Sequence, residues 1–575
     1  MSGKDPDGLS GRTSAEAAAD LVALLSDEGV SHLFINPGTD TAPVQEALAA
    51  ARSAKTAHPE TVLCLHEHVA LSAAIGHHMA SAQPQAVMVH VDAGTLNLGG
   101  AIHNAQRNRT PVVVFAGRAP YSVASEVRGH RNSPIHWQQE QLDQPAVMRA
   151  FGKWAMEVPR GRELASIVRR AFQVAKAEPT GPTYVMLPRE ALMELGAGSL
   201  PRRLRPPVPP APDPTSLGEM AASLAGAQRP VIVTARTGAR PENVAVLARI
   251  AEIIGAPVLD QRDRANLPAH HPLYAGPEDA RFLPRADAVL LLDVEVPWVP
   301  ALAAPPPEAR VLQIDMDCAK PAMPLWSFPV ELGMTADTQL ALPQLEEALC
   351  RLATPERAQV WAARRRQVEA ELAEVHAGWL RRSASPEPTD APDAMLAALD
   401  RALPEDALLV EEAVTNRPAA ARQVHRGPAR YFQTGAPALG WAIGAAVGIK
   451  LAKPALPVVV VCGDGSFNFG VPNAALWTAQ RAGAPFVTVI LNNRSYYASK
   501  RPVLSLYPGG AADAAGDFPE TELSPAIDYT LLARACGGDG RAVEAAGDLR
   551  DALSWALGEV DQGRCTVLDA RLPRP

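Results

Sequence analysis

The sequence predicts an α/β fold made of three doubly wound parallel-sheet domains. Three segments alternate short β-branched runs with Ala- and Leu-rich helical stretches, the pattern of parallel sheets covered by helices. A chain of 575 residues is too long for one hydrophobic core. Two Pro-rich stretches divide the segments. We therefore expect domains at 13–195, 217–350 and 393–575.

The elements expected in the first two segments follow from their apolar runs. The first segment should begin a helix at Ser14 and place strands at 32–38, 86–94, 111–117 and 182–188. A linker with seven prolines follows at 201–216, because proline lacks a backbone donor. The second segment should hold strands at 230–235, 256–260, 288–294 and 310–316. A polar helix at 356–379 and a Ser/Pro-rich joint at 383–392 lead to the third segment.

Composition and charge exclude several classes of protein. The formal net charge is -8 and no long Lys/Arg run offsets it, so nucleic acid is not an expected partner. The polar start lacks a signal-peptide core, and the cysteines show no paired metal spacing; we expect a cytoplasmic protein. The apolar run 438–449 is far shorter than the roughly 20 residues that span a bilayer. It predicts a buried glycine-rich helix and no membrane partner.

A motif for a metal and a diphosphate stands at 456–497. A β-branched run ends at Gly463-Asp464-Gly465-Ser466, and 26 residues from Ser466 to Leu491 lead to Asn492-Asn493. That separation fits one strand–helix–strand unit, which places Asp464 and Asn493 at the carboxyl ends of neighbouring parallel strands, where open α/β sheets bind ligands. A carboxylate with amide and backbone oxygens suits Mg²⁺. Ser466 can add a donor beside the closely approaching glycine backbone.

GDG, this spacing and NN together resemble the thiamine-diphosphate motif of the superfamily of acetolactate synthase, pyruvate decarboxylase and benzoylformate decarboxylase. The resemblance spans all three segments and implies thiamine diphosphate and Mg²⁺ as cofactors. It implies a metal site formed by Asp464, Asn493 and the backbone carbonyl of Ser495. The other cofactor contacts that it implies near this motif are Gly463, Gly465, Ser466 and Tyr496. Tyr497 and Ala498 would then face the substrate.

The same resemblance implies a catalytic glutamate ahead of an Ala-rich helix, and LCLHEHVALSAAIGHHMA (63–80) supplies Glu67. Its carboxyl group would bind the aminopyrimidine of the cofactor and favour the imino form that activates the thiazolium. Asn97 would lie in the loop over the thiazolium. Further cofactor contacts are implied at Thr415, Asn416, Pro437 and Leu439. A plain helix cap is the alternative for Thr415 and Asn416; Leu439 would wedge between the two cofactor rings.

Residues that select the reaction resemble more than one branch. His90 stands where benzoylformate decarboxylase carries an active-site histidine, so we expect a proton shuttle or a hydrogen-bond donor; a structural histidine is the alternative. Thr39, in an N-P-G-T turn, would lie near the substrate carboxylate. Gln139, in a stretch similar to acetolactate synthases and acyl-CoA lyases, could reach the cofactor or be a surface amide. The middle segment has TARTGARP (234–241) and no clear G-x-G loop, so FAD is not supported.

The sequence thus predicts an enzyme that makes or breaks a carbon–carbon bond beside a carbonyl. The favoured reaction is decarboxylation of a 2-oxo acid, followed by protonation or by attack on a second carbonyl. A lyase that cleaves 2-hydroxyacyl-CoA or acyloins is the alternative, with an acyl or aldehyde substrate. A non-catalytic cofactor-binding paralogue is a second alternative, although Glu67, Asp464 and Asn493 are all present. The resemblance implies active sites shared between subunits, hence a homodimer or a homotetramer.

Overall fold

The computed structural model describes residues 16–435 and 437–574. Three six-stranded sheets occur in this part of the chain, and every strand pair within them is parallel. The predicted α/β class with three doubly wound sheets is therefore confirmed. Each sheet falls within one predicted segment, while the segment limits themselves stay predictions.

The first sheet has the strand order β2-β1-β3-β4-β6-β5. Two of its strands, β2 and β5, have only four residues each and were not among the strands expected from the apolar runs. The strands are β1 (His32–Ile35), β2 (Glu60–Leu63), β3 (Gln85–Val89), β4 (Val112–Arg118), β5 (Trp154–Glu157) and β6 (Thr183–Pro188).

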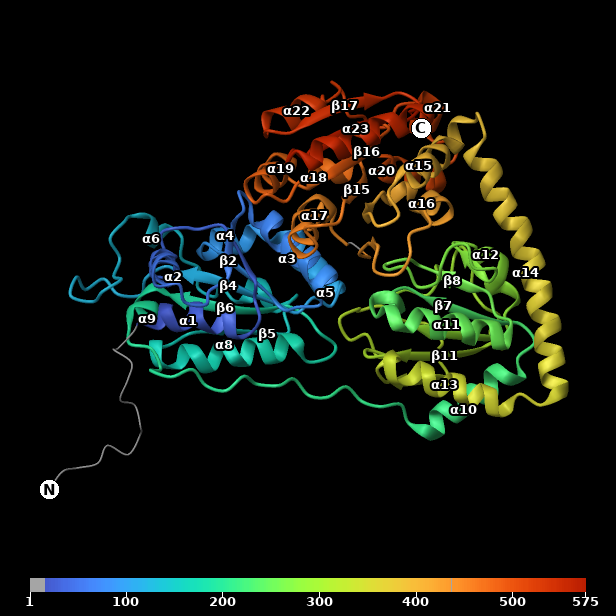
Figure 1. Cartoon of the computed structure of the whole chain (residues 1–575), viewed down its shortest axis with the longest axis horizontal. Helices are drawn as coiled ribbons and strands as arrows, with labels where there is room; N and C mark the ends of the chain where they lie inside the picture. The colour runs from blue at the N-terminus through green and yellow to red at the C-terminus, as the bar shows by residue number, and fades with distance from the viewer. Residues whose placement is uncertain (1–15, 436, 575) are drawn as a thin grey trace. The chain divides into compact units, whose positions relative to one another are not determined.

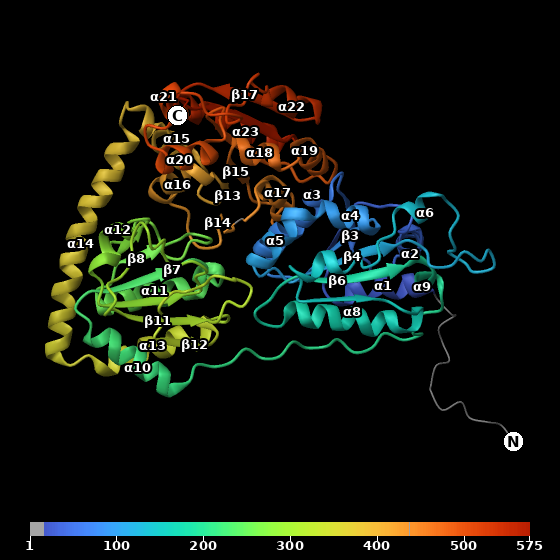
Figure 2. The same cartoon turned by 180° about the vertical axis from the view of Figure 1, so that it is seen from behind.

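Helices cover both faces of this sheet (Figures 1 and 2). They are α1 (Ala17–Asp27), α2 (Ala42–Ala54), α3 (Glu67–Ser81), α4 (Val91–Asn97), α5 (Gly99–Arg107), α6 (Ile135–Gln138), α7 (Ala146–Arg149), α8 (Gly161–Lys176) and α9 (Arg189–Met193). In both views α1 and α8 lie on one face and α3 and α5 on the other. The expected helix start at Ser14 lies outside the described residues.

The second sheet has the order β12-β11-β10-β7-β8-β9. Its strands are β7 (Pro230–Thr234), β8 (Val258–Asp260), β9 (Tyr274–Gly276), β10 (Ala288–Leu292), β11 (Arg310–Asp315) and β12 (Leu332–Thr335). Its helices are α10 (Pro214–Gly226), α11 (Pro241–Ile254), α12 (Asp279–Phe282), α13 (Thr338–Leu352) and α14 (Pro355–Ser383), with 3₁₀ turns at Thr237–Ala239 and Leu283–Arg285. The predicted polar helix is α14, the long helix at the edge of Figure 1.

The first predicted linker ends earlier than expected. Residues 201–213 form neither helix nor strand, but α10 begins at Pro214. Asp213 caps this helix by accepting a 2.7 Å hydrogen bond from the Ser216 amide, and proline is well suited to the first helical position. The expectation that 214–216 belong to the linker is therefore wrong, because Asp-Pro here is a helix start.

The third sheet has the order β14-β13-β15-β16-β18-β17. Its strands are β13 (Leu408–Glu412), β14 (Tyr431–Phe432), β15 (Val458–Gly463), β16 (Val487–Asn492), β17 (Asp539–Val543) and β18 (Thr566–Arg571). Its segment contains α15 (Ala391–Ala402), α16 (Arg417–Gln423), α17 (Trp441–Ala452), α18 (Asp464–Phe469), α19 (Pro472–Arg481), α20 (Tyr497–Leu506), α21 (Ala511–Ala515), α22 (Tyr529–Ala535) and α23 (Leu549–Asp561), with 3₁₀ turns at Pro388–Asp390, Val414–Asn416 and Ala546–Asp548.

The chain divides into two compact units. The first contains the residues up to Pro207 together with 435–455 and 468–485, and the second contains 208–434, 456–467 and 486–575. The helices α3, α17 and α19 therefore belong to the first unit. The third sheet belongs to the second.

A close crossing of α3 and α17 organises the first unit. A Cβ added at Gly448 would lie 1.8 Å from the Ala73 carbonyl oxygen, and one added at Gly76 would lie 2.1 Å from the Ala445 oxygen. Only glycine allows the two backbones to approach this closely. The apolar run predicted as a buried glycine-rich helix is α17, buried from Trp441 to Ile449. Within 16–435 and 437–574, no helix is both long and apolar enough to cross a membrane.

Candidate active site

Glu67 is the first residue of α3 and its side chain is buried, with 5% of the residue exposed. The Asn97 amide donates a 3.0 Å hydrogen bond to its Oε2. A Cβ added at Gly94 would lie 3.1 Å from Glu67 Oε1, so a glycine on α4 leaves room for this carboxyl group. Two residues predicted from separate motifs are thus in direct contact.

The loop that carries Pro437 and Leu439 is fixed to α3 and α5. The Asn104 side chain donates to the Ala438 carbonyl at 2.8 Å and accepts from the Ala438 amide at 3.1 Å. His68, the residue after Glu67, contacts the Gly440 carbonyl through Nε2 at 3.1 Å. Burial lowers the pKa of His68 below its ordinary value, so the neutral ring donates from Nε2. These contacts hold the 437–440 segment beside the start of α3.

His90 stands at the N-cap position of α4, and its side chain contacts two other side chains. Its Nδ1 forms a short hydrogen bond with Asp40, and its Nε2 lies 3.0 Å from Gln139 Oε1. Burial by itself lowers the pKa of His90, but the hydrogen bond and negative charge of Asp40, aided by Gln139, outweigh burial and raise the pKa above its ordinary value. Thr39, His90 and Gln139 line one narrow pocket, so three predicted residues are brought together.

The metal motif lies where the spacing placed it. Strands β15 and β16 are parallel neighbours, with Gly463 opposite Leu491, and Asp464 and Asn493 follow them directly. Asp464 is buried; its carboxylate accepts hydrogen bonds from the backbone amides of Gly465 at 2.8 Å and Arg494 at 2.7 Å. Burial raises the pKa of Asp464, an effect that these amides partly offset.

Asn493 and Ser495 form a tight turn after β16. The Asn493 side-chain oxygen accepts from the Ser495 amide at 2.9 Å, and the Ser495 hydroxyl donates to the Thr521 carbonyl at 3.1 Å. Ser466 is buried in α18. A Cβ added at Gly465 would lie 3.2 Å from the Tyr496 ring, whereas one added at Gly463 would meet no atom within 4 Å. Space therefore remains beside the Gly463 backbone.

Two of the remaining predicted residues of the second unit line another pocket. Thr415 and Ala498 line a pocket of about 310 Å³ together with Arg417 and Arg501. Asn416 stands at the N-cap position of α16, but its side chain makes no capping hydrogen bond. Tyr496 precedes α20, which begins at Tyr497. The helix-cap alternative therefore describes the position of Asn416 but not the use of its side chain.

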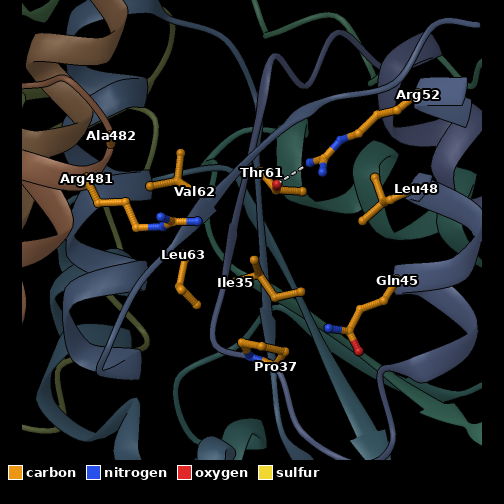
Figure 3. A pocket seen from close by; sticks show the side chains of 10 residues that line it. All are labelled: Ile35, Pro37, Gln45, Leu48, Arg52, Thr61, Val62, Leu63, Arg481 and Ala482. Carbon is orange, nitrogen blue, oxygen red and sulfur yellow. Dashed lines mark hydrogen bonds between the residues drawn. The ribbon is translucent and has the colours of Figure 1, made fainter. Parts of the chain in front are cut away.

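None of the predicted site residues lines a second pocket of the first unit, which has a volume of about 480 Å³ (Figure 3). It lies between α2, the edge strand β2 and the end of α19. The guanidinium groups of Arg52 and Arg481 approach it from opposite sides, and Arg52 donates a hydrogen bond to Thr61.

Sequence reasoning missed several residues that position the site. Asp40, His136 and Asn104 are buried polar residues of the first unit, and Asp569 of β18 accepts a 2.7 Å hydrogen bond from the side chain of Asn492. Asp40 gave one signal, a carboxylate placed between a strand end and a helix start. His136 lies in α6, a helix of four residues that is too short to show periodicity, and gave none.

Two family models match the chain. The thiamine pyrophosphate enzyme N-terminal TPP binding domain matches residues 15–147, and the corresponding C-terminal TPP binding domain matches residues 414–570. The chain belongs to the thiamine-pyrophosphate-dependent enzyme superfamily. The first match contains Glu67, Asn97 and His90, and the second contains the GDG and NN motifs. Thiamine pyrophosphate, also called thiamine diphosphate, is thus the cofactor of this enzyme.

Relatives of this thiamine-pyrophosphate-dependent enzyme include decarboxylases and synthases. It is 28% identical over 553 residues to benzoylformate decarboxylase of Pseudomonas aeruginosa, covering 93% of this chain and 95% of the relative. It is 24% identical over 558 residues to acetolactate synthase of Bacillus subtilis, covering 93% and 90%. A 4-hydroxybenzoylformate decarboxylase of Rhodococcus jostii shares its fold, with a TM-score of 0.77 at 23% identity, covering 98% and 100%.

Proposed function

We propose that this enzyme is a 2-oxo acid decarboxylase that uses thiamine diphosphate and Mg²⁺. The observation that supports the reaction best is the pocket lined by Thr39, His90 and Gln139, in the same unit as the buried Glu67–Asn97 pair. A cationic imidazole and a hydroxyl group are suitable partners for the carboxylate of a 2-oxo acid. The relatives named for 2-oxo acid decarboxylation cover nearly the whole chain.

The residues of the second unit fit the metal and the diphosphate. Asp464, Asn493 and the Ser495 carbonyl supply the hard oxygens that Mg²⁺ requires. The open space at Gly463 suits a phosphate group. We assign Gly465, Ser466, Thr415, Asn416 and Tyr496 to the same end of the cofactor.

The residues of the first unit fit the organic rings. Glu67 would hydrogen-bond the aminopyrimidine, and Asn97 fixes its carboxyl group in place. The Pro437 carbonyl would accept a hydrogen bond from the aminopyrimidine. The Leu439 side chain would wedge between the two cofactor rings and keep the cofactor bent. The bound cofactor supplies the carbon nucleophile and the electron sink of the reaction. The chain itself orients the substrate carboxylate with Thr39 and His90, and His90 can move a proton at Nε2.

We propose that the active site is shared between subunits. Glu67 and Asp464 belong to different compact units, and we propose a homodimer or homotetramer in which the cofactor joins the first unit of one subunit to the second unit of another. Tyr497 and Ala498 would then complete the substrate pocket. We place the enzyme in the cytoplasm, acting on a small molecule and on neither nucleic acid nor membrane.

A substrate panel tests the reaction. The purified enzyme with thiamine diphosphate and Mg²⁺ is incubated with 2-oxo acids, acyloins and 2-hydroxyacyl-CoA esters, and both CO₂ and aldehyde are measured. We expect CO₂ from at least one 2-oxo acid, and none from the Glu67→Gln protein. Release of aldehyde from an acyloin or a CoA ester without CO₂ would show that the enzyme is a lyase and not a decarboxylase. Full cofactor binding without any turnover would favour the non-catalytic alternative.

The expectation that FAD has no place in the middle segment stays a prediction. In the turn after β7, the Gly238 amide donates to the Asn266 side chain at 2.8 Å, and a Cβ added at Gly238 would lie 2.1 Å from the Ala265 carbonyl oxygen. The Gly238 amide and the space beside its Cα are therefore already occupied by atoms of the protein. A purified enzyme that shows no visible absorbance of a bound flavin would support this prediction.

A further inference from the structure

Two histidines of the narrow pocket in the first unit differ in their surroundings. His90 follows β3 and His136 lies in α6, and both line the pocket with Thr39, Asp40 and Gln139. His90 meets a carboxylate at one ring nitrogen and an amide oxygen at the other. Both ring nitrogens of His90 can therefore donate, which is the arrangement of an imidazolium.

The surrounding backbone holds Asp40 and His90 in contact. Asp40 is 3% exposed, and its second carboxylate oxygen accepts from the Val91 amide at 3.3 Å. A Cβ added at Gly117 would lie 1.4 Å from Asp40 Oδ2, and one added at Gly38 would lie 2.1 Å from His90 Nδ1. Glycine at these two positions therefore clears the space that the pair occupies.

His136 presents the opposite arrangement. The Asn132 amide donates to His136 Nδ1 at 3.3 Å, which fixes the neutral tautomer with its hydrogen on Nε2. That Nε2 atom is buried and has no hydrogen-bond partner within the described residues, and the whole residue is 4% exposed. Burial, followed by the charges of Arg189 and Arg131, lowers the pKa of His136.

We propose that Asp40 is a positioning residue that holds His90 as an imidazolium, while His136 in the same pocket stays neutral. This inference rests on the proposed function for the identity of the substrate, a 2-oxo acid. The positive charge of His90 would then act on the carboxylate of the acid. Environments that move the pKa values of two titratable groups in opposite directions are typical of sites where one group acts as an acid and the other as a base.

Other charged groups near the pair determine the expected pH range. Asp92 of α4 adds negative charge near His90, and its own oxygens accept from the Ala93 amide and the Gln141 side chain. Arg189 of α9 donates to the Thr39 carbonyl at 3.2 Å and, with Arg131, opposes a positive charge on His136. His90 has the higher pKa, so it stays protonated as pH rises through the range where His136 is already neutral.

Histidine hydrogen–deuterium exchange tests the inference without a substrate. The imidazole Cε1 hydrogen exchanges with D₂O at a rate that follows ring protonation, and mass spectrometry of peptides resolves each histidine. The enzyme loaded with thiamine diphosphate and Mg²⁺ should show half-maximal exchange at a higher pH for His90 than for His136. Equal midpoints, or the reverse order, would overturn the proposal even if the enzyme decarboxylates 2-oxo acids.

Two matched variants separate a directed contact from general negative charge. Asp40→Asn should lower the His90 midpoint by about one pH unit or more, because an opposite charge in contact shifts a pKa by that amount. Asp92→Asn removes the same charge from the same region without touching the ring, and should lower it less. Equal effects of the two variants would contradict a positioning role for Asp40. If Asp40→Asn does not fold, the difference between the exchange midpoints of His90 and His136 in the parent protein decides whether the proposal holds.

The catalytic consequence is a shift in the pH profile. With any 2-oxo acid that the panel identifies, the parent should lose kcat/KM as pH rises through the His90 midpoint. In Asp40→Asn this loss should occur at lower pH, by the shift measured in exchange. An unchanged basic limb would refute the role of Asp40 in the reaction. A panel without any substrate would contradict the proposed function, while the exchange result would still stand.

Discussion

Replacing Gly448 by alanine should open the crossing of α3 and α17. The added Cβ would lie 1.8 Å from the Ala73 carbonyl oxygen and 2.7 Å from the His77 amide nitrogen. Both are backbone atoms, so no side chain can rotate away, and one helix must move. Overpacking of this kind costs about 1–3 kcal/mol, and the direct overlap with backbone places Gly448→Ala at the upper end of that range.

Helix propensity acts in the opposite direction and sets the net effect. Alanine is better than glycine in a helix by about 1 kcal/mol, so a net loss of about 2 kcal/mol remains. A domain of this size loses roughly 2–4 °C in Tm per kcal/mol, so calorimetry should show a fall of roughly 4–8 °C. The cofactor should also bind more weakly, because α3 begins at Glu67 and α17 follows Leu439.

Gly558→Ala is the matched control. Gly558 lies inside α23, and an added Cβ there would meet no atom within 4 Å. This variant gains helix propensity without a clash, so its Tm should equal or exceed that of the parent. If Gly448→Ala melts at the same temperature as Gly558→Ala, the reasoning from backbone contact is refuted.

Three further predictions concern the cofactor. Glu67→Gln keeps the shape of the side chain but cannot share an acid proton with the aminopyrimidine. Hydrogen–deuterium exchange at C2 of the bound cofactor, measured by NMR after acid quench, should therefore slow by about 10²–10⁴-fold. Exchange as fast as in the parent would exclude Glu67 as the activating residue. Asp464→Ala should abolish Mg²⁺-dependent thiamine diphosphate binding in calorimetry while the far-UV circular dichroism stays that of the parent, and unchanged affinity would remove Asp464 from the metal site. The Glu67→Gln and Asp464→Ala proteins, refolded together, should regain activity because mixed dimers hold one site with neither lesion; mixed dimers without activity would contradict a shared site.

The sequence by itself determined the features that depend on local pattern. Alternating β-branched and Ala-rich runs established three parallel sheets, and the spacing from GDG to NN placed Asp464 and Asn493 after adjacent strands β15 and β16. These predictions succeeded because one strand–helix–strand unit has a narrow range of lengths. Short strands such as β9 and β14 escaped detection, since two or three residues carry no periodicity.

Only the tertiary structure decided which distant residues meet. Asp40 follows β1 and His90 follows β3, and they touch because these strands are neighbours although β2 lies between them in the chain. The order of strands in a sheet is set by the packing of helices on its faces, which local periodicity does not encode. His136 likewise reaches the pocket from α6, a helix of only four residues, so its unpaired donor became visible only once the chain was folded.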